Sequence, residues 1–422
     1  MLTYCSRVGS NKSHQQGTMR ILHLSADYPD PIDAAKPHAI FNLLRLAPDH
    51  DHRVFSLNRT SFKQRCTGQV FRDDVSDTHR AIRYPALPKG IRQGHYLDML
   101  AGWITDECQS SRYRPDLIHA HKLTVEGIVG WKLARHFRVP LVISAQGDAD
   151  LKIARAKPGL RRSFAEVWHQ AGVALPFAPW TRNELNTLLG QRAGPTLELP
   201  CPGPADEMIE PTLAPPVIRT AFNLQDHRNK NAEGLFRAIG LVARQRPQIV
   251  LEVIGAGDAQ TLALLQKNAN RHAPGHVRFR GAVAHSNMQA LLNTSAAFAL
   301  ISHCESFGRV FAEALLAGTP CLIPEGRAID GYLDEGEVTL CADPSNVNDI
   351  ARQLLRLVRE QRQFKERLRQ SQHDGKLDFL RRDAIAAVYA NALELARSTL
   401  LKPQFSESVA ATPAFQPLPV SA

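Results

Sequence analysis

The stretch ESFGRVFAEALLAGTP, residues 305–320, decides how the fold of this chain is interpreted. It follows the apolar run AAFALIS, which predicts a buried strand, and its own pattern predicts an apolar helix opened by Gly308 and closed by a glycine and a proline. Two glutamates, Glu305 and Glu313, lie eight positions apart at the beginning of this helix. The free backbone N–H groups and partial positive charge of a helix start suit phosphate or sugar oxygens. We therefore expect the segment to bind a ligand.

The spacing of the two glutamates argues against a pair of glycosidase carboxylates. Such a pair acts across one bond, with its carboxyl groups about 5–9.5 Å apart. Eight residues of helix place two side chains about 12 Å apart along the axis. Glu305 precedes the helix, in a loop with Ser306, Phe307 and Gly308. The pattern therefore favours two carboxylates, on Glu305 and Glu313, that hold different parts of one extended ligand.

Apolar runs and helical patterns alternate through most of the chain. MRILHLSADYP, HRVFSL, PDLIHAH and VPLVISAQGD predict strands in the first half, and the alternation restarts with VIRTAFNL and IVLEVIGAG. Nearly continuous apolar strands separated by helices predict a parallel sheet covered on both faces. We therefore predict an α/β fold of two Rossmann-like doubly wound domains that face a central cleft, with the ligand site outside the carboxyl ends of the strands.

A proline-rich segment, PCPGPADEMIEPTLAPP, separates the two halves and predicts a linker. The last helical pattern, FLRRDAIAAVYANALELAR, precedes a tail that contains proline and serine. The opening residues lack the apolar centre of a signal peptide. The predicted division is a disordered leader at 1–18, a first domain at 19–200, a linker at 201–216, a second domain at 217–375, a helix at 376–401 that can pack back on the first domain, and a disordered tail at 402–422.

The composition limits the classes of partner. The net charge of +10 implies an anionic partner, and sugar nucleotides, anionic membrane surfaces and nucleic acid all fit it. Only 7% of the residues are aromatic and no nucleic-acid module signature is present, so we do not expect nucleic acid. The 7 cysteines lie far apart without a Cys-x-x-Cys pair, which favours a reducing cytoplasm over a disulfide framework. No apolar run is long enough to predict a membrane span.

The stretch at 305–320 resembles the signature of retaining glycosyltransferase family 4, whose members have the two-Rossmann-domain GT-B fold. The matching residues are Glu305, Phe307, Gly308, Glu313, Ala314, Ala317, Gly318 and Pro320. The resemblance runs from Met19 to about Arg397 and implies a hexosyltransferase with an acceptor-side first domain and a nucleotide-sugar-binding second domain. It also implies that Glu305 contacts hydroxyl groups of the transferred sugar and that Glu313 hydrogen-bonds the nucleotide ribose.

The same resemblance implies two cations that hold the diphosphate of the donor. In AFNLQDHRNKN, Lys230 matches the lysine of the family, whereas Asn223 stands where the family has an arginine. Arg228 can supply the missing positive charge from the same loop. Gly255 and Gly257 follow a predicted strand, but the third glycine of a dinucleotide fingerprint is missing. The resemblance implies instead that this glycine pair forms a tight turn near the base of the nucleotide.

The first domain offers candidates from two strand ends. His119 and His121 resemble the Asp-x-x-His-x-His pattern of the family, in which the second histidine reaches the sugar. Gln146 replaces the histidine of the family's His-Gly-x-Asp pattern, and with Asp148 it is expected to contact donor or acceptor. Asp148 and Asp150 also spell Asp-x-Asp, the metal motif of another glycosyltransferase fold, but we expect no metal in this one.

Departures from the family pattern leave alternatives open. Ala34 and Ala35 replace the glycine pair after the first strand, and each adds a methyl group where phosphate would approach. Together with Asn223 and Gln146, they favour a sugar-nucleotide-binding protein without turnover as one alternative. A sugar-nucleotide epimerase on the same fold is another.

The expected function is transfer of a sugar, with retention of anomeric configuration, from a nucleoside diphosphate sugar to a glycan, lipid-linked or small-molecule acceptor in surface polysaccharide or glycoconjugate biosynthesis. The expected catalytic residues are Glu305, His121 and Lys230, and the expected donor contacts include Ser306, Phe307 and Gly308. We expect no cofactor and no metal. The expected location is the cytoplasm, either free or peripheral on the inner face of the plasma membrane. There a basic cluster would contact anionic lipid, unless it is simply a solvated face. The cluster consists of Lys152, Arg155, Lys157, Arg161 and Arg162.

Overall fold

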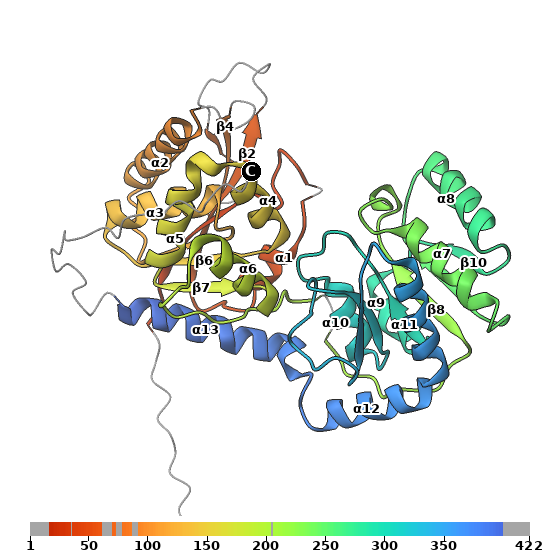
Figure 1. Cartoon of the computed structure of the whole chain (residues 1–422). Coiled ribbons are helices and arrows are strands. Elements are labelled where there is room, and N and C mark those ends of the chain that lie inside the picture. Colours follow the sequence, from red (N-terminus) through yellow and green to blue (C-terminus); the bar gives the residue numbers. More distant parts are fainter. Residues whose placement is uncertain are drawn as a thin grey trace, which may run out of the picture.

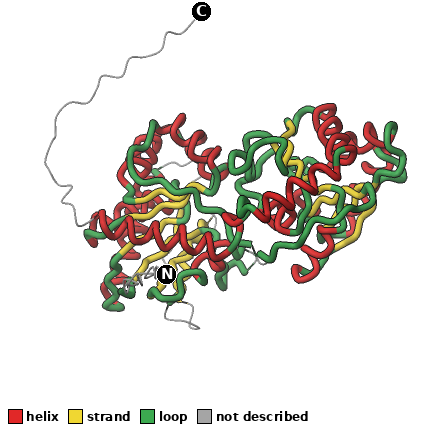
Figure 2. The backbone as a smooth tube through the Cα atoms, turned by 90° about the horizontal axis from the view of Figure 1, so that it is seen from below, coloured by secondary structure: helices red, strands yellow, loops and turns green. Residues whose placement is uncertain are grey.

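The computed structural model describes residues 17–34, 36–60, 70–72, 78–86, 92–203 and 206–399, and for 70–72 it describes the backbone alone. Most of the expected leader and the whole expected tail at 402–422 lie outside the described residues, as does Ala35. The described chain forms two α/β lobes that lie side by side (Figures 1 and 2).

The first lobe is built on a sheet of 7 strands in the order β3-β4-β2-β1-β5-β6-β7. All neighbours pair in parallel except β3, which runs antiparallel to β4 at one edge. The chain starts in the middle, builds outward to one side and then returns to β5 on the other side, so the strand order reverses between β1 and β5. The strands are β1 (Arg20–Ser25), β2 (Asp51–Thr60), β3 (Val70–Arg72), β4 (His79–Pro85), β5 (Leu117–Ala120), β6 (Leu141–Ala145) and β7 (Val173–Pro176).

Helices cover the first sheet, and every residue of β5, β6 and β7 is buried beneath them. α3 packs against β1, β5 and β6, and α5 packs against α3. The apolar runs therefore become strands because both faces are removed from water. The helices of this lobe are α1 (Ala39–Leu44), α2 (Gln93–Ser110), α3 (Val125–Phe137), α4 (Asp148–Ala156), the 3-10 turn η2 (Pro158–Leu160), α5 (Arg161–Gln170) and α6 (Pro179–Leu189).

The second lobe is built on a parallel sheet of 6 strands in the order β10-β9-β8-β11-β12-β13. This is the doubly wound order, and it reverses between β8 and β11. The predicted fold class of two Rossmann-like domains is therefore confirmed, with the antiparallel edge strand β3 added. The strands are β8 (Val217–Ala221), β9 (Val250–Ile254), β10 (Val277–Gly281), β11 (Ala297–Ala299), β12 (Cys321–Pro324) and β13 (Thr339–Ala342).

Helices and strands of the second lobe alternate from β8 to β12, after which β13 follows β12 directly and α12 follows α11. The helices are the 3-10 turn η3 (Leu224–Asp226), α7 (Ala232–Ala243), α8 (Ala259–His272), α9 (His285–Asn293), α10 (Arg309–Leu316), α11 (Val347–Arg359) and α12 (Gln361–His373). Side-chain oxygens cap two of the α-helices, because Asp258 accepts from the N–H of Thr261 and Asn346 accepts from that of Asp349. No helix in the described ranges is long and apolar enough to cross a membrane.

The last helix leaves the second lobe and returns to the first. After the 3-10 turn η4 (Asp378–Leu380), α13 (Arg382–Thr399) packs on β6 and β7 (Figure 1). Its buried residues, among them Ile385, Tyr389 and Leu393, form one apolar cluster with first-lobe residues. The chain therefore crosses between the lobes twice, once before β8 and once after α12.

Candidate functional site

A lysine and a glutamate form an ion pair at the point where the strand order of the second sheet reverses. Lys230 follows β8 and Glu305 follows β11, which are neighbouring strands. Lys230 Nζ donates to Glu305 Oε2 at 2.6 Å, and the two side chains are 19% and 13% exposed. Ser302 Oγ donates to the same oxygen at 3.1 Å. Two predicted site residues that lie 75 positions apart therefore meet at the carboxyl edge of the sheet.

Asparagine side chains connect the loop that carries Lys230 to two neighbouring loops. The side chain of Asn229 donates to the carbonyl of Cys304 at 3.0 Å and accepts from its N–H at 3.2 Å, while the N–H of His303 donates to the Asn229 carbonyl at 2.8 Å. Asn231 lies in the left-handed region, with φ 52°, and donates to the carbonyl of Pro344 at 2.7 Å. The lysine between these asparagines is thus fixed on both sides.

The start of α10 lies directly beyond Glu305. Gly308 takes φ 70°, and a Cβ atom there would lie 2.5 Å from the ring of Phe311, so the position requires glycine. Phe307 is buried, with its ring edge-on to Tyr332 at 6.2 Å between centroids, whereas Ser306 is half-buried. The loop therefore anchors itself through the phenylalanine and keeps the helix start beside the ion pair.

Glu313 lies on α10 with only 7% of its surface exposed. Burial raises the pKa of its carboxyl, against the opposing influence of Arg309 and His285. Within the described ranges no side-chain or backbone group donates a hydrogen bond to this carboxylate. A buried carboxylate with unused acceptor capacity is suited to accept from ligand hydroxyl groups.

Close packing explains why glycine occupies both positions of the pair after β9. Gly255 has φ 151°, and a Cβ atom there would lie 1.8 Å from the carbonyl oxygen of Phe222. A Cβ atom at Gly257 would lie 2.6 Å from that of Leu224. The loops after β8 and β9 therefore approach each other so closely that side chains at these positions do not fit.

The remaining donor-side candidates lie apart from the ion pair. Asn223 is exposed and caps η3, because its side-chain oxygen accepts from the N–H of Gln225 at 3.1 Å. Arg228 is exposed, and its side chain makes no hydrogen bond or ion pair with any described residue. The structure thus places Lys230 and Glu305 together but leaves the other two polar candidates in solvent.

The corresponding point of the first sheet also carries an ion pair, which sequence reasoning missed. Lys122 follows β5, and its Nζ donates to Asp27, which follows β1, at 2.7 Å. Glu126 is buried below them and accepts from the N–H of Ala26 at 3.0 Å. Burial lowers the pKa of Lys122, but Glu126 and Asp27 outweigh it and raise this pKa above its ordinary value. Burial raises the pKa of Glu126.

Asp150 is enclosed next to this group. Its carboxylate accepts from the N–H groups of Gln146 at 2.8 Å and Thr124 at 3.3 Å. Burial raises the pKa of Asp150 to about 7, although these hydrogen bonds oppose the rise. Both oxygens of Asp150 thus serve the backbone, while the Asp148 side chain pairs with an arginine of the other lobe. The two aspartates of the Asp-x-Asp pattern therefore have different partners here.

His121 and Gln146 lie at the carboxyl edge of the first sheet. The His121 side chain is fully buried, and its Nε2 lies 3.0 Å from Nδ1 of His23. Gln146 donates through Nε2 to the His121 carbonyl at 3.1 Å. Among the described residues, His23, His119 and His121 form the cluster whose ring nitrogens lie close enough, within 4.8 Å of one another, to hold a metal ion.

Arg327 of the second lobe reaches the first lobe. Its Nε lies 3.2 Å from Asp148, its Nη1 lies 3.7 Å from Glu184, and its guanidinium stacks over the ring of Trp180 at 4.8 Å. Burial raises the pKa of Asp148, with Arg327 opposing. A lone arginine in a long loop carries no sequence pattern, which is why this contact was not predicted.

Two hydrogen bonds strengthen the same contact between the lobes. Trp180 Nε1 donates to the carbonyl of Ala328 at 2.9 Å, and the Tyr332 hydroxyl donates to the carbonyl of Phe177 at 2.9 Å. The loop between β12 and β13 is therefore docked on the start of α6. This docking holds the carboxyl edges of the two sheets toward each other.

The loop after β1, where the expected glycine pair is replaced, is held by a buried charge. Lys36 Nζ donates to Asp30 and to the side-chain oxygen of Asn58, each at 2.7 Å. Desolvation opposes the ionised form of Asp30, but Lys36 and Asn58 outweigh it and lower its pKa to about 2. Ala34 is exposed on this loop.

The basic cluster of the first lobe is spread over α4, η2 and α5. Arg155 is paired with Glu184, so it is not a free charge. Lys152, Arg161 and Arg162 are exposed, and burial lowers the pKa of Lys157. The cluster therefore presents fewer free cations than its sequence suggests.

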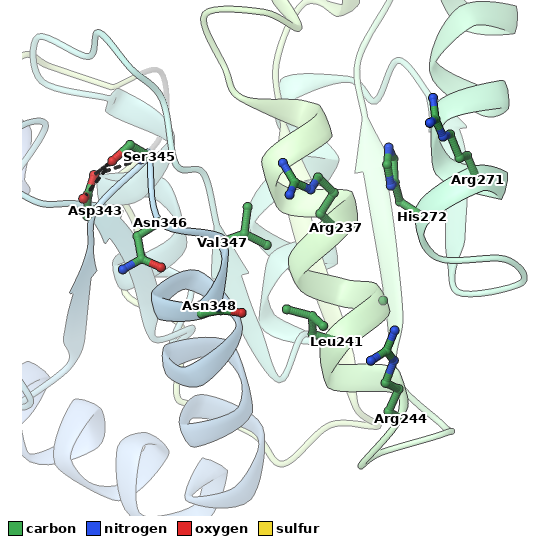
Figure 3. Close-up of a pocket in the computed structure, with 11 residues that line it drawn as sticks. Arg237, Leu241, Arg244, Arg271, His272, Asp343, Ser345, Asn346, Val347 and Asn348 are labelled. Atoms are coloured by element: carbon green, nitrogen blue, oxygen red, sulfur yellow. Dashed lines mark hydrogen bonds between the residues drawn. The ribbon is translucent and has the colours of Figure 1, made fainter.

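A cavity of about 790 Å³ lies away from these residues, between α7, the end of α8 and the start of α11 (Figure 3). Arg237 and Arg244 project from α7, and Arg271 and His272 lie at the end of α8. None of the predicted site residues lines it.

Comparisons with known proteins agree with this architecture. Residues 221–374 match the model of a family described as "Glycosyl transferases group 1". The glycogen synthase of Mycobacterium tuberculosis (strain CDC 1551 / Oshkosh) is 24% identical over 369 residues, which cover 79% of this chain and 84% of that protein. The D-inositol 3-phosphate glycosyltransferase of Streptomyces bingchenggensis (strain BCW-1) is 27% identical over 267 residues, which cover 57% of this chain and 58% of that protein.

Solved structures show the same fold over the whole described chain. The sucrose-phosphate synthase from Thermosynechococcus elongatus superposes with a TM-score of 0.65 at 18% identity. The superposition covers 90% of this chain and 100% of the synthase chain. HepE from Anabaena in complex with UDP-glucose superposes with a TM-score of 0.61 at 17% identity, covering 89% and 99%. At such identities the likeness concerns the fold alone. Residues 221–374 are therefore similar to the group 1 glycosyl transferases, and the described chain has the two-domain GT-B fold.

Proposed function

We propose that the protein is a retaining glycosyltransferase that moves a sugar from a nucleoside diphosphate sugar to a glycan, lipid-linked or small-molecule acceptor. The observation that carries the proposal is the ion pair between Lys230 and Glu305, set directly before the start of α10. A fixed cation beside a helix start stabilises the negative charge of a departing diphosphate. The carboxylate beside it accepts hydrogen bonds from sugar hydroxyl groups.

The chemistry assigned to these groups needs no protein nucleophile. The bond between the anomeric carbon and the phosphate oxygen breaks, and a bond from the acceptor oxygen forms on the same face of the sugar. The acceptor proton passes to the leaving phosphate oxygen, and the configuration is kept. In this scheme Lys230 and Arg228 hold the diphosphate, Glu305 orients the sugar and Glu313 accepts from the ribose. Docking of the lobes through Arg327 excludes water from the reaction.

Uridine is the first donor base to test. The solved structures of HepE from Anabaena hold UDP, UDP with glucose, and UDP-glucose, and this chain shares their fold. We infer a UDP-sugar on that support and expect no metal requirement, because in the proposed scheme Lys230 and Arg228 would both bind the diphosphate.

Nucleotide release tests the proposal. The protein is incubated with uridine, guanosine and adenosine diphosphate sugars, and free nucleoside diphosphate is measured with and without candidate acceptors. One donor should release its nucleotide, and Glu305→Gln should lower this release at least tenfold, while the exposed control Glu366→Gln should not. Release that is unchanged in Glu305→Gln would overturn the site. The anomeric configuration of the product, read by proton NMR, decides between retention and inversion.

A binding protein without turnover is the second candidate. The exposed Asn223, in the place of a family arginine, and the solvent-exposed Arg228 favour it, since neither is held against the ion pair. Tight donor binding without nucleotide release in any acceptor mixture would establish this candidate. An epimerase would instead convert one donor sugar into another without any acceptor.

We also propose a peripheral contact with anionic membrane, as a lipid-linked acceptor in surface polysaccharide biosynthesis would require. The exposed Lys152, Arg161 and Arg162 support it, and each basic residue near such a surface contributes about 1 kcal/mol. Co-sedimentation with phosphatidylglycerol vesicles should weaken when these three residues are changed to glutamate. Unaltered co-sedimentation would refute the contact.

A further inference from the structure

Three histidines of the first lobe form a continuous hydrogen-bonded chain across neighbouring strands. His52 on β2 places Nδ1 2.8 Å from Nε2 of His23 on β1. His23 places Nδ1 3.0 Å from Nε2 of His121, which follows β5. At the other end, His52 Nε2 lies 2.6 Å from the carbonyl oxygen of Ala47. The chain therefore runs from a backbone carbonyl to a predicted site residue at the carboxyl edge of the sheet.

The surroundings of the three rings favour their neutral form. Burial lowers the pKa of His52, and it lowers the pKa values of His23 and His121 well below their ordinary range, with the neighbouring imidazoles adding to both effects. A neutral imidazole carries one proton, so one of its nitrogens donates and the other accepts.

The backbone carbonyl then fixes every proton in the chain. A carbonyl oxygen only accepts, so His52 carries its proton on Nε2 and its Nδ1 accepts. His23 must therefore donate from Nε2, which leaves its Nδ1 as an acceptor. His121 must in turn donate from Nε2. The lone pair at the end of the chain is consequently on Nδ1 of His121.

That lone pair has no partner in the described part of the chain. His121 Nδ1 is a buried atom without a hydrogen bond. The ring is held in place by His119, whose centroid lies 3.9 Å away and whose nitrogens contact the hydroxyl groups of Tyr389 at 3.0 Å and Ser144 at 2.9 Å. An unpaired buried acceptor is costly, which indicates that a hydrogen-bond donor completes it.

We propose that His52 and His23 are positioning residues that hold His121 with its proton on Nε2 and so reserve its Nδ1 lone pair for a hydroxyl group of the substrate. The identity of the ligand rests on the proposed function, whereas the tautomer does not. A metal ion at the histidine cluster is the competing occupant. It is disfavoured because His119 already contacts hydroxyl groups through both ring nitrogens.

Tautomers are read directly from long-range ¹H–¹⁵N spectra of ligand-free protein labelled at histidine, with signals assigned by single His substitutions. We expect His52, His23 and His121 all to carry the proton on Nε2. His52→Leu removes the acceptor for His23 and should produce a population of His121 with its proton on Nδ1. His52→Asn keeps an acceptor oxygen near the place of Nδ1 and should preserve the wild-type state. The control is His50→Leu, because His50 is a half-buried neighbour of His52 that is not part of the hydrogen-bonded histidine chain.

Binding of UDP-glucose, measured by calorimetry, tests the ligand. The dissociation constant should rise about fivefold in His52→Leu and change less than about twofold in His52→Asn, as expected for one impaired hydrogen bond. Wild-type spectra with the His121 proton on Nδ1, or an unchanged His121 in a folded His52→Leu protein, would overturn the positioning role. One equivalent of tightly bound zinc found by elemental analysis would also overturn it. If the wild-type tautomers are as expected but all variants bind UDP-glucose with equal affinity, the hydrogen-bonded histidine chain is upheld and the contact with a substrate hydroxyl group is refuted.

Discussion

Replacing Lys230 by methionine should remove the positive charge that faces Glu305 while keeping a side chain of similar length. The two side chains touch at 2.6 Å and are 19% and 13% exposed. After the change, the hydroxyl of Ser302, at 3.1 Å, is the only remaining hydrogen-bond donor to the Glu305 carboxylate within the described residues. The perturbation therefore leaves a mostly buried carboxylate without its cation.

The size of the effect follows from this environment. A hydrogen bond to a charged group contributes about 1.5–3 kcal/mol net, and solvent around a partly exposed pair reduces that value. We expect ligand-free Lys230→Met to lose about 1–2 kcal/mol of second-domain stability. During turnover the loss should be larger, because removing one fixed donor at a site of developing charge lowers kcat by about 10²–10³.

Nucleotide release from the active donor measures the effect on turnover, and circular dichroism with chemical unfolding measures the effect on the fold. Lys230→Arg keeps the charge and should recover part of the activity, although its fork has a different shape. Lys267→Met changes an exposed lysine on α8 and should leave both readouts unaltered. A folded Lys230→Met protein whose kcat/KM lies within about threefold of the wild type would refute the role of this lysine.

Three further changes test other parts of the structure. Gly255→Ala forces a Cβ atom to 1.8 Å from the Phe222 carbonyl oxygen, so the second domain should lose at least about 2 kcal/mol in chemical unfolding. The pKa of Asp150 is raised to about 7, so its contribution to stability is present below pH 4 and is lost as the pH rises through 7. Asp150→Asn should therefore flatten the fall in melting temperature between pH 5 and pH 8. An equally steep fall in the variant would contradict the raised pKa. Trp180→Phe removes the 2.9 Å bond to the Ala328 carbonyl, worth about 1 kcal/mol, and should raise the radius of gyration in solution scattering by favouring separated lobes.

The fold could be predicted from the sequence because its pattern is local. Continuous apolar strands alternate with helices in both halves, and this alternation alone implies parallel sheets and a site at their carboxyl edges. The proline-rich segment indicated where one sheet ends and the next begins. The antiparallel pairing of β3 with β4 was not predicted, because a short edge strand has too few residues to show a period.

The site could be predicted only in part. Glu305 and Lys230 were each placed at a strand end, but their contact depends on β8 and β11 being neighbours, which no local pattern reports. Arg327 and Lys122 were missed because single charges in loops have no spacing to recognise. Gly255 was expected to lie near the nucleotide, and the structure places it against the backbone carbonyl of Phe222. That packing does not test the expected nucleotide contact.

Each of the two sheets carries an ion pair at the point where its strand order reverses. Where the strand order reverses, two helices diverge and leave the loops of two neighbouring strands uncovered, so charged side chains from those loops can meet without being trapped in the core. The second sheet uses this place for Lys230 and Glu305, and the first uses it for Lys122 and Asp27. An ion pair of this kind forms only when the loops after both strands are in position. Each pair therefore depends on the correct assembly of its sheet. Ion pairing and folding are therefore coupled at these two points, and a variant that disturbs either pair must be checked for folding before its activity is interpreted.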